Sequence, residues 1–152
     1  MSSALRRQAW VIGLAILLAA LFVFTRIIQP DYGADGFGSL VRAALPFVFA
    51  VAGQTVVVIA GGIDLSIASM MALTSVTAAT LMDGASEPFG IVAVAAVLLL
   101  GFLLGAVNGI LVVVSRVPDI VVTLAMLFVW QGAALLVRDS PGGAASEWLK
   151  EL

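Results

Sequence analysis

Residues 61–66 read Gly-Gly-Ile-Asp-Leu-Ser and stand at the junction of two uncharged apolar stretches, 43–63 and 65–82. Each stretch is long enough for a helix that crosses a bilayer, which takes about 18 to 20 residues. The motif therefore places a carboxylate, Asp64, at membrane depth. A charge there costs roughly 2.5 to 3.5 kcal/mol, so a cap, a partner, water or a function must offset the cost.

The composition is that of a membrane protein, because 62% of the 152 residues are hydrophobic and 11% are charged. Cutting the chain at its charges leaves five uncharged stretches of 18 to 28 residues. They are apolar throughout rather than alternating, which excludes a β-barrel. We expect one all-α transmembrane module, residues 1–152, forming a polytopic helical bundle with about five membrane-spanning helices. The expected spans lie near 8–28, 40–60, 65–82, 89–114 and 119–137.

The N-terminus is similar to a secretory signal, since Arg6 and Arg7 precede an apolar run at 9–24. No small-x-small cleavage site follows the run, so an uncleaved first span is the better interpretation. Basic residues divide almost evenly between the two sides of the predicted topology. The leading arginine pair then decides the orientation, and it favours a cytoplasmic N-terminus.

The chain has neither cysteine nor histidine. It therefore lacks disulfides, thiolate chemistry, the usual metal ligand and the usual proton shuttle. The sequence also contains no phosphate-binding loop, no nucleophile with a base and no metal-ligand cluster. We expect no catalytic residue, no metal site and no cofactor bound by this chain.

Two interpretations of residues 61–66 stay open. Gly61 and Gly62 permit positive φ and can end a helix, while Asp64 or Ser66 can accept hydrogen bonds from the N–H groups that open the next helix. This capped hairpin needs no substrate. Alternatively, the same irregular backbone lines a path or forms a gate, because such backbone is tolerated at depth where protein or a water-filled cavity surrounds it.

The span near 89–114 carries Gly101, Gly105 and Gly109 at four-residue spacing, a pattern typical of a close helix-packing face. Asn108 lies beside this face and can hydrogen-bond across the contact. Residues 130–131, Trp-Gln, put a second polar pair near the middle of the last span, where we expect the amide to face the bundle interior.

Residues 52–73, which include the Gly-Gly-Ile-Asp-Leu-Ser motif, resemble the signature region of permease subunits in sugar-importing ABC transporters, the ribose-permease-like family. A second stretch, 108–124, with Asn-Gly-Ile-Leu, Arg-Val-Pro and Ile-Val-Val-Thr-Leu, is similar to the next recognisable segment of that family. The resemblance covers roughly residues 8–140. Ala68 stands where the family usually has glycine, and Gln131 stands where arginine is common. Such permeases have about twice as many residues, so the chain looks like an N-terminal half.

The resemblance implies a passive subunit that translocates a monosaccharide such as ribose across the bacterial inner membrane. Its expected partners are an ABC ATPase subunit that uses the ATP, a periplasmic sugar-binding protein, a second permease chain and membrane lipid, with no nucleic acid. Gly61, Gly62, Asp64 and Ser66 are the candidates for the translocation path or gate.

Two alternatives to the sugar permease remain. An importer of the same architecture could carry autoinducer-2, a nucleoside or a branched-chain amino acid. The chain could also be a small helical adaptor or a truncated, nonfunctional permease fragment.

Overall fold

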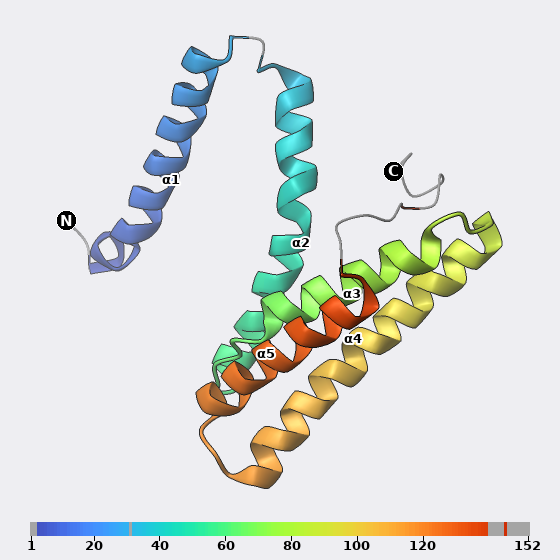
Figure 1. Cartoon of the computed structure of the whole chain (residues 1–152). Coiled ribbons are helices and arrows are strands. Elements are labelled where there is room, and N and C mark those ends of the chain that lie inside the picture. Colours follow the sequence, from blue (N-terminus) through green and yellow to red (C-terminus); the bar gives the residue numbers. More distant parts are fainter. Residues whose placement is uncertain (1–2, 31, 140–144, 146–152) are drawn as a thin grey trace. The chain divides into compact units, whose positions relative to one another are not determined.

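The computed structural model describes residues 3–30, 32–139 and 145, and its side chains are described from residue 9 onward except at position 87. Within this part the chain forms five α-helices and no strand (Figure 1). The helices are α1 (Ser3–Ile28), α2 (Ala34–Ile59), α3 (Ile67–Met82), α4 (Glu87–Ser115) and α5 (Asp119–Val137). The expected all-α fold is confirmed.

Four of the helices, all except α3, are long and apolar enough to cross a membrane. The remaining helix, α3, is apolar but has 16 residues. Every expected span ends within one residue of an observed helix end, whereas the starts differ by up to six residues.

The largest difference is at the start of α2, which begins at Ala34 rather than near residue 40. Asp35 lies in its first turn, where a negative charge complements the positive end of the helix. Gly36 and Gly38, which precede the expected span near 40–60, therefore lie in α2 as well. Because the helix begins at Ala34, Pro46 lies in its interior, a position that membrane helices tolerate better than soluble ones do.

The chain divides into two compact units, Met1–Phe49 and Ala50–Leu152, and the boundary falls within α2. In the first unit, the ring of Phe22 lies edge-on to Tyr32 and Phe37, with centroid distances of 6.2 and 6.1 Å. The Arg26 guanidinium donates a hydrogen bond to the Tyr32 carbonyl. These contacts fasten the end of α1 to the start of α2.

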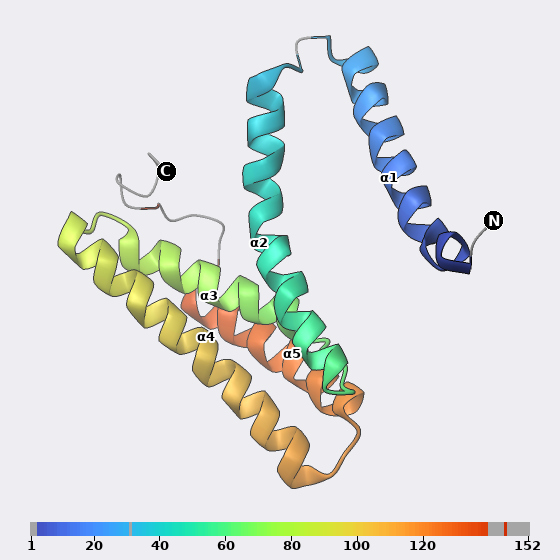
Figure 2. The ribbon, with the colours of Figure 1, turned by 180° about the vertical axis from the view of Figure 1, so that it is seen from behind.

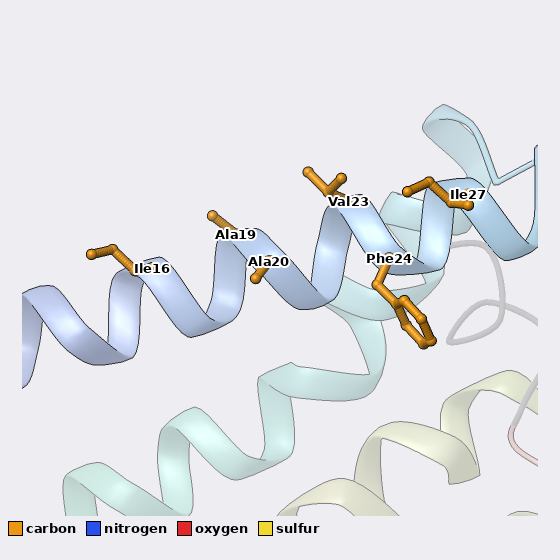
Figure 3. A pocket seen from close by; sticks show the side chains of 6 residues that line it. All are labelled: Ile16, Ala19, Ala20, Val23, Phe24 and Ile27. Carbon is orange, nitrogen blue, oxygen red and sulfur yellow. The ribbon is translucent and has the colours of Figure 1, made fainter.

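The first helix exposes almost all of its described side chains within its own unit. One open depression along α1 is apolar and has alanines at its floor (Figure 3). It is lined by Ile16, Ala19, Ala20, Val23, Phe24 and Ile27. A helix that is apolar all round is typical of a membrane span rather than of a soluble surface helix.

In the second unit, α3 packs against both α4 and α5, and the three helices lie side by side (Figure 2). Its buried apolar centre is formed by Leu73, Leu104 and Ala134, one from each helix. Side-chain contacts join the starts of α3 and α5 at one end of the unit. At the other end, the Arg138 guanidinium lies 3.7 Å from the Asp83 carboxylate. Hence α3 and α5 run parallel, and α4 runs antiparallel to both.

Candidate functional site

The break between α2 and α3 begins with a Schellman motif, the double hydrogen bond that often ends a helix at glycine. The N–H of Gly61 donates to the Val58 carbonyl at 3.0 Å, and the N–H of Gly62 donates to the Val57 carbonyl at 2.9 Å. Gly61 has φ of 88°. This 6→1 and 5→2 pattern with glycine in the left-handed region is what the pair of glycines predicted. The helix ends here because its last carbonyls are satisfied locally.

Two side chains at the start of α5 contact Ile63, the next residue of the break. The Asp119 carboxylate accepts a hydrogen bond from the backbone N–H of Ile63, and the Thr123 hydroxyl lies 3.2 Å from the Ile63 carbonyl. A Cβ added at Gly62 would lie 3.2 Å from Asp119 Oδ2, which is tighter than an ordinary contact. Glycine at position 62 thus lets the backbone approach the carboxylate.

Asp64 closes the break by capping the backbone of Ser66. Its Oδ1 accepts hydrogen bonds from the Ser66 N–H at 2.7 Å and from the Ser66 hydroxyl at 2.6 Å. This is an Asx-turn, with the carboxylate bonded two residues ahead. Neither Asp64 nor Ser66 accepts from the N–H groups inside the first turn of α3, so the predicted cap lies one step before the helix.

From Ser66 a line of side-chain hydrogen bonds crosses the bundle. The Asn108 amide Nδ2 of α4 donates to Ser66 Oγ at 2.6 Å, and the Trp130 indole Nε1 of α5 donates to Asn108 Oδ1 at 3.1 Å. Ser66 is 0% exposed and Asn108 is 4% exposed. We call Asp64, Ser66, Asn108 and Trp130 the polar relay.

Asn108, the member of the polar relay on α4, lies two turns before the end of that helix. Asn108 precedes the end of α4 at Ser115 by seven residues, or about 10 Å along the helix axis. The 29 residues of α4 rise about 43 Å, whereas the hydrocarbon core is about 30 Å thick. With α4 centred in the bilayer, Asn108 lies a few ångström inside the hydrocarbon. Irregular backbone here is tolerated because the surrounding helices satisfy it.

The structure brings Gly101 and Gly105 against α3. A Cβ at Gly101 would lie 3.8 Å from Thr74, and one at Gly105 would lie 3.8 Å from Met70. Both are ordinary van der Waals distances. Gly109 has no neighbour within 4 Å, because the antiparallel register carries this part of α4 past the start of α3. The packing face is therefore shorter and looser than the spacing of the three glycines predicts.

The Trp-Gln pair of α5 separates into an inner and an outer residue. Trp130 is half-buried and bonded to Asn108, whereas Gln131 is exposed in the second unit. Adjacent residues of a helix point about 100° apart, and with Trp130 turned towards Asn108 the next residue lies on the exposed side. The prediction that the glutamine amide faces the bundle interior is wrong for this unit, and the indole takes that place.

A family model described as "Branched-chain amino acid transport system / permease component" matches residues 36–146. The match includes the break, both of its attachments to α5 and the whole polar relay. The chain belongs to this permease family.

Curated relatives agree with the family. The ribose import permease protein of Escherichia coli (strain K12) is 33% identical over 136 residues, which are 87% of this chain and 41% of that protein. The galactofuranose transporter permease protein of the same strain is 33% identical over 144 residues, with 87% and 41% covered. The autoinducer 2 import system permease protein of Escherichia coli O9:H4 (strain HS) is 30% identical over 150 residues, with 93% and 42% covered. The chain thus spans about two-fifths of the length of these permeases.

No solved structure matches the chain.

Sequence reasoning about this permease motif missed two residues of the site. Asp119 reads as an ordinary acid in the first turn of a helix, and Thr123 reads as a hydroxyl that bonds its own helix, as it also does here to the Asp119 carbonyl. Both lie more than 50 residues from the break in sequence. Their positions in the first turns of the last expected span, 119–137, gave no signal, because contact with Ile63 depends on the parallel pairing of α3 and α5.

Proposed function

We propose that this chain contributes the translocation path of a binding-protein-dependent ABC importer that carries a sugar across the bacterial inner membrane. The observation that carries the proposal is the break at 60–66, an irregular segment that holds a carboxylate between two apolar helices. A permease needs a polar passage there, and an intramembrane acid is by default a candidate for it.

A sugar is favoured over an amino acid by the relatives. The family description names branched-chain amino acid transport, but the relatives that are 30 to 33% identical are named for ribose, galactofuranose and autoinducer 2. Solutes of this kind carry hydroxyl groups, which can donate hydrogen bonds to a carboxylate. Autoinducer-2 is the second candidate cargo because one of these relatives is its import permease.

The proposed assembly follows from the transporter class. A separate ATPase subunit hydrolyses ATP, a periplasmic binding protein delivers the solute, and a second permease chain, identical or related, completes the path. The N-terminus of this chain lies in the cytoplasm. Gly61, Gly62, Asp64 and Ser66 form the gate or wall of the path.

The test compares Asp64→Asn with Asp64→Ala in the complete permease, assembled with its ATPase and binding protein in vesicles. Asparagine keeps an oxygen that accepts from Ser66 but removes the charge, whereas alanine removes both. We expect Asp64→Asn to assemble normally and to lose most of its ATP-dependent uptake of labelled sugar. Asp35→Asn, which changes an exposed acid in the first turn of α2, is the matched control and should transport normally.

Wild-type uptake by Asp64→Asn, together with reduced assembly of Asp64→Ala, would leave Asp64 with the capping role alone. Competition by unlabelled ribose, autoinducer-2 and leucine then identifies the cargo class. If leucine abolishes uptake of the labelled sugar, the assignment of the cargo to sugars is overturned.

A further inference from the structure

The geometry points to a positioning role for Asn108 and Trp130. We propose that these two side chains hold the Asp64 carboxylate in its transport position by acting through Ser66. The proposal deepens the proposed function and rests on it, because it assigns residues of α4 and α5 to the control of the acid in the break.

The order of donors in the polar relay follows from the chemistry of its members. An indole Nε1 only donates, so the atom of Asn108 that faces Trp130 must be the carbonyl oxygen Oδ1. The amide Nδ2 then faces Ser66 Oγ, which accepts. The single proton of the Ser66 hydroxyl is left for Asp64 Oδ1. Each hydrogen bond therefore points towards the carboxylate, and replacing one member disturbs every bond after it.

The two middle members of the relay, Ser66 and Asn108, lie where water cannot substitute for a lost partner. Ser66 and Asn108 are buried, and Met70 Sδ covers both at 3.4 and 3.5 Å. A buried polar group that loses its partner keeps the full cost of desolvation. Ser66 Oγ could turn towards the Met70 sulfur if Asn108 were lost, and that rotation would take its proton from Asp64.

The relay fixes only one of the two carboxylate oxygens. Asp64 Oδ1 accepts both bonds from Ser66, and Oδ2 accepts none from the described residues. Asp64 is half-buried, so it remains partly accessible. The three helices thus orient an acceptor oxygen for a hydroxyl of the solute. A displacement of α4 or α5 changes that orientation.

The proposal is tested with Trp130→Phe and Asn108→Leu in the complete permease, alone and combined with Asp64→Asn. The first variant removes the indole N–H and keeps an aromatic ring. Thr74→Val is the matched control, because the Thr74 hydroxyl bonds to its own helix at Met70 and lies beside α4 outside the relay. The readout is the KM and the maximal rate of ATP-dependent solute uptake, divided by the amount of assembled complex.

We expect Trp130→Phe and Asn108→Leu to lower the maximal uptake rate by about 3- to 18-fold, the equivalent of one interhelical hydrogen bond. Thr74→Val should match the wild type. In the Asp64→Asn background, Trp130→Phe should cause no further loss of residual uptake. A role confined to stability predicts instead equal losses in both backgrounds, and that result would overturn the proposal.

A fluorescence measurement keeps the proposal falsifiable if the leucine variant does not assemble. With Trp10 and Trp148 replaced by phenylalanine, Trp130 is the remaining tryptophan of this chain. Ser66→Ala should shift its emission, because the Asn108 amide turns when its acceptor is lost. Unchanged emission would refute the relay. If Asp64→Asn transports normally, the transport role proposed for Asp64 fails. If Asp64→Asn does not transport while Trp130→Phe is normal, only the positioning role fails.

Discussion

Replacing Gly61 by alanine tests whether the break is held in a backbone conformation that needs glycine. Gly61 has φ of 88°, and a Cβ built there meets no atom within 4 Å. Gly109 is the matched control, since its Cβ would also meet nothing within 4 Å but its backbone is helical. Gly→Ala changes the unfolded chain equally at both sites, so this contribution cancels in the comparison.

What remains is the strain of an L-residue in the left-handed region, about 1 to 2 kcal/mol. We expect Gly61→Ala to be less stable than Gly109→Ala by this amount, which corresponds to about a 5- to 30-fold change in the ratio of folded to unfolded protein. The assay is reversible unfolding of the chain in mixed micelles, in which the fraction of a denaturing detergent is raised stepwise. Equal stabilities of the two variants would refute the Schellman geometry, and so would a less stable Gly109→Ala.

Three further predictions concern the attachments and the topology. Asp119→Leu should destabilise the second unit by about 1 to 3 kcal/mol in the same unfolding assay, since the Ile63 N–H loses its acceptor, while Asp119→Asn should retain most of the stability. Arg138→Ala should cost at most about 1 kcal/mol and less at high salt, because its ion pair is partly exposed to solvent; a larger loss would contradict this assignment. Single cysteines at Asp35 and Gly84 should react with an impermeant maleimide from the periplasmic side and one at Ser3 should not, and the reverse pattern would overturn the cytoplasmic N-terminus.

The helix ends were predictable because each has a local chemical cause. Gly61 and Gly62 end α2 through their own backbone, and charged residues at 83 and 138 end α3 and α5 within one residue of the expected positions. The start of α2 was not predictable from hydropathy, because Asp35 and two glycines read as a loop although an acid in a first turn favours a helix.

Only some residues of the site were predictable, because the others lie far from the break along the chain. Asp64 and Ser66 are neighbours of the glycines, and Asn108 stands out as an amide in an apolar span. Trp130 and Asp119 join them only through the pairing of α3 with α4 and α5. Successive residues of a helix point about 100° apart, so the sequence shows which residues share a face of the helix. Which of these faces meets a neighbouring helix depends on how the two helices are aligned along their axes.

The short length of α3 links the acid of the break to the thickness of the lipid. Its 16 residues rise about 24 Å, some 6 Å less than an average hydrocarbon core. For α3 to cross a core of that thickness, the bilayer has to thin beside this helix or the break has to sink into the acyl chains, and each ångström of mismatch costs a fraction of a kcal/mol. Longer acyl chains draw Asp64 deeper, where its charge is more expensive. Lipid chain length therefore tunes the energy of the Asp64 carboxylate without any change in the protein sequence.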